Sequence, residues 1–143
     1  LGVGTGFSMA AKLAHPNKEV VCLYGDGSFG MTAFDMETAQ RFGAPYLAIV
    51  GNNSAMNQIR YGQISKYGSQ RGGVGNKLGD VDFSLFGKMI GGYGEEVREA
   101  SQIQPALLRA REAIAKTGKC AVVNVWVDPN EYAPGTKAQT MYK

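Results

Sequence analysis

Residues 20–53 read VVCLYGDGSFGMTAFDMETAQRFGAPYLAIVGNN, and this stretch decides the fold. Val20–Tyr24 is a continuous apolar run that begins with β-branched residues, which is typical of a buried parallel strand. A second apolar run, Tyr46–Val50, follows after a helical segment. Two buried strands joined through one helix predict a βαβ unit and therefore a parallel sheet.

Capping and terminator residues predict the helices. Thr32–Phe42 is expected to be a single helix, with Thr32 and Asp35 forming a capping box and Gly43 ending it. The segment 64–79 is polar and glycine-rich, and we expect a long surface loop there after a short helix within Ser54–Gln63. Further helices are predicted at Ser8–Ala14 (Ser8 as N-cap), Asp82–Met89 and Pro105–Thr117, and further strands at Glu95–Val97 and Val122–Val127.

These elements predict an α/β fold with a mostly parallel sheet and helices on both faces. The 143 residues, 44% hydrophobic and 19% charged, suit one globular domain. We expect residues 1–127 to form that domain and residues 128–143 to be a C-terminal tail. Because the chain opens within the glycine-rich segment 1–6, it is interpreted as the C-terminal piece of a longer protein.

Composition excludes several functional classes. The net charge of +3 comes without a basic, aromatic-interleaved run, which disfavours a nucleic-acid partner. Cys22 and Cys120 lie in apolar runs and are expected to be free, buried thiols rather than zinc ligands or a disulfide. No apolar stretch reaches the roughly 18 residues of a membrane span, and no signal peptide is visible, so we expect a cytoplasmic protein.

Two expected strands end in polar residues that suit a metal site. Asp26 follows the first strand and Asn53 follows the second, 27 positions later. Ligands of parallel sheets bind at the carboxyl ends of strands, so both side chains are expected to reach one point. Asp-Gly and Asn-Asn each favour turns, and either one alone would be read as a turn. Their joint placement favours a metal site.

The chemistry of that point favours Mg²⁺ with a diphosphate. Mg²⁺ prefers oxygen ligands and takes one or two carboxylates together with substrate phosphates. Gly25 and Gly27 allow the backbone to approach a diphosphate, and Ser28 offers a hydrogen-bond donor. The N-terminus of the helix that begins at Thr32 is expected to point free N–H groups at the anion.

At these residues the sequence resembles the thiamine-diphosphate enzymes of the acetolactate synthase, pyruvate decarboxylase and benzaldehyde lyase superfamily. The resemblance rests on Gly25-Asp26-Gly27, a spacer of 24 residues and Asn52-Asn53. It implies a C-terminal domain that binds thiamine diphosphate and Mg²⁺. The implied metal ligands are Asp26, Asn53 and the carbonyl of Ala55, and the implied cofactor-binding residues are Gly2, Gly4, Gly25, Asp26, Gly27, Ser28, Asn53, Ala55 and Met56.

Two features depart from the family pattern. Many relatives carry a bulky methionine in the N-terminal loop that keeps the cofactor bent, and a gapless match places Gly4 there. Leu1, Val3 or a residue outside this chain would then take that role. Where relatives often carry tryptophan or tyrosine after the Asn pair, this chain has Met56, which suggests a roomier pocket.

The resemblance implies that the activating glutamate belongs to a different domain, usually on a neighbouring subunit. No catalytic residue is therefore assigned within this chain. Asp35, Glu37, Glu95 and Glu96 are interpreted as solvated charges. The expected partners are the remaining domains of the same enzyme in a homodimer or homotetramer, together with a small-molecule substrate, and neither nucleic acid nor a membrane.

The segment NNSAMNQIRYGQ and the ending NVWVDPNEYAPGTKAQTMYK look most like 2-hydroxyacyl-CoA lyases and oxalyl-CoA decarboxylases. This implies a carbon–carbon lyase that yields formyl-CoA and an aldehyde or ketone, with acetolactate synthase or oxalyl-CoA decarboxylase as the alternative. Arg60, Lys66 and Arg71 would meet CoA phosphates. The expected active-site lid comprises Tyr132, Pro134, Gly135, Thr136 and Lys137. An alternative of another class is a nucleotide-binding or structural module without chemistry.

Overall fold

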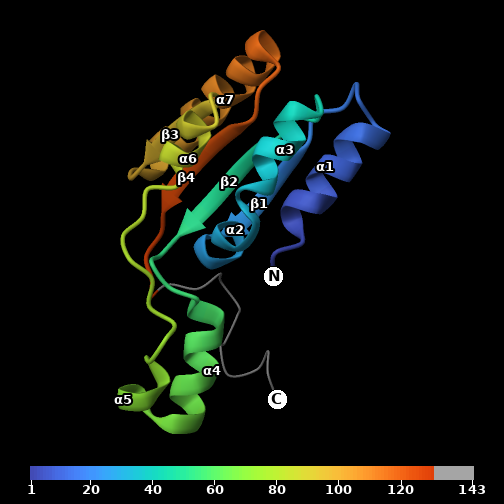
Figure 1. Cartoon of the computed structure of the whole chain (residues 1–143). Helices are drawn as coiled ribbons and strands as arrows, with labels where there is room; N and C mark the ends of the chain where they lie inside the picture. Colours follow the sequence, from blue (N-terminus) through green and yellow to red (C-terminus); the bar gives the residue numbers. More distant parts are fainter. Residues whose placement is uncertain (131–143) are drawn as a thin grey trace.

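The sheet predicted from sequence is present and wholly parallel. The structure, a computed structural model, describes residues 1–130 and contains a four-stranded sheet of order β1-β2-β4-β3 (Figure 1). Every neighbouring pair of strands runs in parallel. The expected α/β class is therefore confirmed. The strands are β1 (Val21–Gly25), β2 (Leu47–Asn52), β3 (Tyr93–Val97) and β4 (Ala121–Trp126).

Helices cover both faces of this sheet, as expected. One face carries α1 (Gly4–Ala14), α2 (Asp26–Thr32), α3 (Asp35–Arg41) and α6 (Ser84–Met89). Phe29 lies at the centre of that face and makes edge-to-face contacts with Tyr24, Phe83 and Phe86. The other face carries α7 (Ile103–Thr117), preceded by the 3-10 helix η1 (Ala100–Gln102).

Coverage of the second face is uneven. α7 packs mainly on β3 and β4, while β1 is an edge strand of the sheet. Cys22 and Tyr24 face the first core, so the alternating residues Val21 and Leu23 face the α7 side. Their exposed fractions are 52% and 77%. Because strands of a parallel sheet are normally buried on both faces, this part of the sheet is an apolar surface open to a further element.

Two helices extend beyond the carboxyl ends of the strands. α4 (Asn57–Tyr67) and α5 (Ser69–Gly72) stand apart from the sheet at that end of the molecule (Figure 1). The prediction of a surface loop over 64–79 is therefore wrong in its first half. A Cβ at Gly72 would lie 2.4 Å from the Ile64 backbone, so only glycine lets α5 pack this closely on α4.

Two further helix predictions need correction. α1 begins at Gly4, and Ser8 lies inside it, where its hydroxyl donates to the Gly4 carbonyl at 2.7 Å rather than capping the helix. The single helix expected over Thr32–Phe42 is broken into α2 and α3. Thr32 ends α2, and its hydroxyl donates to the Gly2 carbonyl, so the predicted capping box is absent.

Other expectations hold in part. Cys22 is half-buried rather than buried, and α6 and α7 begin at Ser84 and Ile103 rather than at Asp82 and Pro105. Gly43 and Gly118 follow α3 and α7 with positive φ angles of 69° and 64°. Both cysteines are free, and burial raises the pKa of the Cys120 thiol to about 11. Within residues 1–130, no helix is both long and apolar enough to cross a membrane. Of the predicted tail 128–143, only residues 128–130 fall within the described part.

Candidate diphosphate and metal site

A pocket of about 260 Å³ lies at the carboxyl ends of β1 and β2. It collects residues that the sequence places far apart, from the first residue of the chain to the first turn of α4. Most of the predicted site lies here. The lining comprises Leu1, Gly25, Asp26, Gly27, Ser28, Gly51, Asn53, Ala55, Met56, Asn57, Gln58 and Ile59.

Asp26 is the buried charge of this pocket, with an exposed fraction of 3%. Its Oδ2 atom accepts hydrogen bonds from the backbone N–H groups of Asn53 and Ala55, each at 3.1 Å. Its Oδ1 atom accepts from the Gly27 N–H at 2.7 Å. The carboxylate at the end of β1 therefore holds the loop at the end of β2 through the backbone N–H groups of Asn53 and Ala55.

Two neutral oxygens belong to the residues whose N–H groups reach this carboxylate. The Oδ1 atom of Asn53 is buried and has no hydrogen-bond partner among the described residues. Ala55 forms an antiparallel bridge with Lys77, and the bonds of that bridge run through the residues on either side of Ala55. The N–H and carbonyl of Ala55 thus both point away from Lys77, and the N–H reaches Asp26.

The glycine motif forms the first turn of α2 and lines the pocket. The helix whose N-terminus lies at the site is therefore α2, which begins at Asp26, and not a helix that begins at Thr32. First-turn N–H groups have no partners within their own helix. A Cβ at Gly27 would lie 3.0 Å from Met56 Cγ, so Gly27 keeps the space between α2 and Met56 open.

The N-terminal residues reach the pocket through Leu1 rather than through Gly4. Gly4 lies in α1, where a Cβ would be 2.5 Å from the ring of Tyr24, and it is not part of the lining. Gly2 lies behind the pocket: its N–H donates to Ser28 Oγ at 3.4 Å and its carbonyl accepts from Thr32. The predicted cofactor contacts of Gly2 and Gly4 stay predictions.

A chain of buried hydroxyls supports this arrangement. Thr5 Oγ1 lies 3.2 Å from Thr32 Oγ1 and 3.3 Å from Tyr24 Oη. Tyr24 Oη lies 3.2 Å from Tyr46 Oη. Burial raises the pKa of both tyrosines, so they stay neutral hydrogen-bonding groups. The network joins α1, α2, β1 and the residue before β2, and it lies beside the segment that leads from α1 to Leu1.

Residues 1–125 match the family model described as "Thiamine pyrophosphate enzyme, C-terminal TPP binding domain". The chain belongs to this family. The resemblance read from the glycine and asparagine motifs is therefore confirmed.

Among curated relatives of this thiamine-pyrophosphate-binding domain are enzymes of two named activities. The 2-hydroxyacyl-CoA lyase 2 of Mus musculus is 32% identical over 137 residues, which cover 95% of this chain and 21% of the relative. The lyase of the same name from Danio rerio is 33% identical, with 95% and 22% covered. The acetolactate synthase large subunit of Mycobacterium tuberculosis is 34% identical, with 94% and 23% covered. The chain thus spans about a fifth of the length of these relatives.

The pocket of this thiamine-pyrophosphate-binding domain fits a divalent cation held jointly by protein and diphosphate. The described residues contain no cluster of three His, Cys, Asp or Glu side chains that could hold a metal ion by themselves. The pocket supplies one carboxylate and the unpartnered amide oxygen of Asn53. Mg²⁺ is typically bound in this way, with one or two carboxylates plus substrate phosphates.

Several lining residues were not predicted from sequence. Gly51, Asn57, Gln58 and Ile59 join the pocket because β2 extends to Asn52 and α4 begins at Asn57. A prediction that a helix begins at Asn57 would have indicated these residues, because the first turn of a helix that follows a ligand-binding loop faces the ligand. The basic residues Arg60, Lys66 and Arg71 lie on α4 and α5, and their proposed role is untested by the fold. The predicted lid residues 132–137 lie outside the described residues.

The acidic residues set aside in the sequence analysis largely form surface pairs. Glu37 pairs with Arg41 at 3.1 Å, one turn away on α3. Glu95 pairs with Arg109, and this guanidinium lowers the pKa of the Glu95 carboxyl. Glu96 accepts from Trp126 Nε1 at 2.6 Å. None of these three carboxylates lines the pocket.

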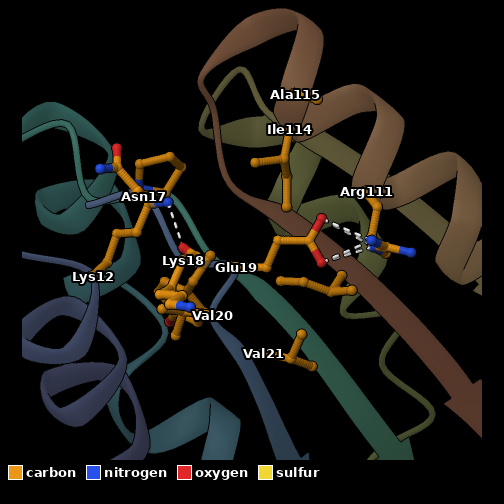
Figure 2. A pocket seen from close by; sticks show the side chains of 12 residues that line it. Lys12, Asn17, Lys18, Glu19, Val20, Val21, Arg111, Ile114 and Ala115 are labelled. Carbon is orange, nitrogen blue, oxygen red and sulfur yellow. Dashed lines mark hydrogen bonds and ion pairs between the residues drawn. The ribbon is translucent and has the colours of Figure 1, made fainter. Parts of the chain in front are cut away.

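A second pocket, of about 220 Å³, lies at the opposite end of the same strands, between α1 and α7 (Figure 2). Three of its four charged side chains, those of Lys12, Glu19 and Arg111, have partners within the pocket. Glu19 and Arg111 point toward each other and form an ion pair at 2.8 Å. Lys12 donates to the Lys18 carbonyl at 2.7 Å. These satisfied groups give the second pocket no evident ligand chemistry.

Proposed function

We propose that the complete protein is a thiamine-diphosphate- and Mg²⁺-dependent carbon–carbon lyase, and specifically a 2-hydroxyacyl-CoA lyase. One observation carries the cofactor assignment: a buried carboxylate holds the loop that presents the unpartnered amide oxygen of Asn53. The substrate assignment is supported by relatives named 2-hydroxyacyl-CoA lyase 2, which align with nearly the whole chain.

In this proposal the residues of the chain bind and orient. Asp26, Asn53 and the Ala55 carbonyl hold Mg²⁺, and Gly27 and Ser28 contact the diphosphate. When bound, thiamine diphosphate supplies a carbon nucleophile and an electron sink. Leu1, Met56 and Ile59 provide the larger apolar side chains of the lining. The acid or base that completes the site comes from another domain.

Partner domains are proposed to cover the apolar surfaces of this chain. Val21 and Leu23 are exposed on β1, and Phe7 on α1 and Phe34 beside α3 are exposed to 71% and 74%. Val21 and Leu23 lie on the α7 side of the sheet, and Phe7 and Phe34 lie on the other side, so both sides carry exposed apolar residues. Exposed apolar surface of this kind marks interaction sites. We therefore propose contacts with further domains of the same enzyme, in a homodimer or homotetramer in the cytoplasm.

Acetolactate synthase is the second candidate, because a relative of that name is 34% identical to the chain. The deciding experiment incubates the complete protein, thiamine diphosphate and Mg²⁺ with a 2-hydroxyacyl-CoA or with pyruvate, and identifies products by mass spectrometry. Formyl-CoA with an aldehyde or ketone supports the lyase, and acetolactate from pyruvate replaces it with the synthase. A protein that binds no thiamine diphosphate would instead be the non-catalytic module considered above.

A further inference from the structure

The loop that carries the proposed metal ligands contains an unusual backbone conformation. Ser54 lies between Asn53 and Ala55 and has a φ of 55°, the one positive φ of a non-glycine residue within residues 1–130. This region is disfavoured for residues with a Cβ. The bend at Ser54 is coupled to the site, because the N–H groups on either side of it, from Asn53 and Ala55, both reach Asp26 Oδ2.

The side chain of Asn52 holds this bend. Asn52 is fully buried at the end of β2, and its Oδ1 atom accepts a hydrogen bond from the Ser54 N–H at 3.1 Å. Its Nδ2 atom donates to the Val81 carbonyl at 2.7 Å and to Asn124 Oδ1 at 3.0 Å. These partners also fix which way the Asn52 amide is turned, because the Ser54 N–H can only donate a hydrogen bond and the Val81 carbonyl can only accept one.

The anchors of Asn52 come from parts of the chain remote in sequence. Asn124 lies in the middle of β4 and is itself fully buried. Its Nδ2 atom has no partner among the described residues, which makes the buried Asn pair costly for the fold. Val81 belongs to the segment 76–81. This segment pairs with residues 53–55, which carry the proposed metal ligands, through a hydrogen bond of 2.7 Å from the Leu78 N–H to the Ser54 carbonyl. The amide thus ties the loop to two independent elements.

A buried polar pair of this kind is weak evidence for stability, and its hydrogen bonds can instead specify one backbone arrangement. We propose that Asn52, anchored by Asn124 and Val81, is a positioning residue that holds Ser54 in its left-handed conformation, so that Asn53 and Ala55 are preset around Asp26 before a divalent cation and diphosphate bind. This inference rests on the proposed function. It assigns a role to the first residue of the Asn pair, whose second residue is the proposed ligand.

The test measures binding rather than turnover. Thiamine diphosphate is titrated by calorimetry into the complete protein at saturating Mg²⁺, and thermal unfolding is recorded without either ligand. Asn52→Ala is expected to weaken binding about 10- to 100-fold, the usual effect of removing an outer hydrogen bond from a metal site. Gln40→Ala is the matched control. The Gln40 amide also bonds a backbone carbonyl and a backbone N–H, at 2.7 and 3.0 Å, but on the Ile90–Cys120 side of the molecule.

A second substitution tests the mechanism of positioning. Glycine adopts positive φ freely, so Ser54→Gly combined with Asn52→Ala is expected to recover a large part of the lost affinity. Ser54→Gly and Ser54→Ala alone correct for the loss of the Ser54 hydroxyl bond to Asp80. If Asn52→Ala does not fold, Asn124→Leu replaces it. That variant removes one anchor and the unpartnered Nδ2 atom, so we expect several-fold weaker binding without a lower unfolding temperature.

The outcomes separate the two levels of the proposal. Absence of binding by the unchanged protein overturns the proposed function and this inference with it. Binding by the unchanged protein, with Asn52→Ala and Gln40→Ala equally close to it in affinity, overturns the inference alone, because Asn52 would then serve only the fold. Weaker binding by Asn52→Ala that Ser54→Gly does not recover also overturns it. Weaker binding that is confined to Asn52→Ala and recovered by glycine supports it.

Discussion

The two ends of the parallel sheet carry pockets of similar volume, about 260 Å³ at the carboxyl ends of β1 and β2 and about 220 Å³ at the opposite end. Each contains a carboxylate. Asp26 is 3% exposed and accepts only from backbone N–H groups, whereas Glu19 is largely exposed and pairs with Arg111. The volume of a pocket therefore does not reveal a site. A site is revealed instead by a buried charged side chain that has no opposite charge as a partner and that lies beside an oxygen without a hydrogen-bond partner.

The strongest test of this contrast neutralises one carboxylate in each pocket. Asp26→Asn is expected to weaken Mg²⁺-dependent binding of thiamine diphosphate at least about 100-fold, because the cation loses the one carboxylate that the described residues place in the pocket. Glu19→Gln is expected to leave binding unchanged. Calorimetric titration of the complete protein measures both. Equal effects of the two substitutions would contradict the assignment of the site.

The space between α2 and Met56 gives a second, smaller effect. In Gly27→Ala the new Cβ would meet Met56 at 3.0 Å, so the side chain must move into the pocket. We expect affinity for the cofactor to fall about tenfold, the effect of modest overpacking. Gly62→Ala is the control, because a Cβ there meets no atom within 4 Å. Gly27→Ala with Met56→Ala should regain affinity, and failure to do so would place the effect elsewhere.

Glu95 provides a paired carboxylate of intermediate exposure. The Arg109 guanidinium lowers the Glu95 pKa from its ordinary value of 4.5. The ionised form is therefore favoured by folding, and its contribution is present above pH 4.5 and is lost as the pH falls through the lowered pKa. Urea midpoints recorded between pH 6 and pH 3 should drop less in Glu95→Gln than in the unchanged protein. Parallel pH profiles would show that this pair does not stabilise the fold.

The exposed pair of the second pocket should have the smallest effect. Arg111→Gln is expected to leave the urea midpoint unchanged within measurement error, because both partners are solvated and ion pairs of this kind contribute little. The comparison is made at low and at high salt. A clear loss of stability at low salt would show that the Glu19–Arg111 pair does more than occupy a solvated surface.

Much of the site could be predicted because it depends on short-range patterns in the sequence. An apolar strand ending in Asp26, and another ending in Asn53 one crossover later, bring both residues to one edge of a parallel sheet. The division between α2 and α3 could not be predicted in the same way. Thr32 has a hydroxyl suited to capping, but it bonds the carbonyl of Gly2, thirty residues away.

The sequence by itself determined the parallel α/β fold, the family and the meeting of Asp26 with Asn53, because strand patterns and the order of a βαβ unit are short-range properties. The tertiary structure alone decided the entry of Leu1 into the pocket, the packing of α5 on α4 and the left-handed bend at Ser54. The packing of α5 on α4 joins Gly72 to Ile64, which are close in sequence. The other two depend on contacts between residues far apart in the chain, such as Asn52 with Asn124 at a separation of 72 positions. Such contacts produce no periodic pattern in the sequence, because buried amides meet their hydrogen-bond partners only once the sheet has assembled.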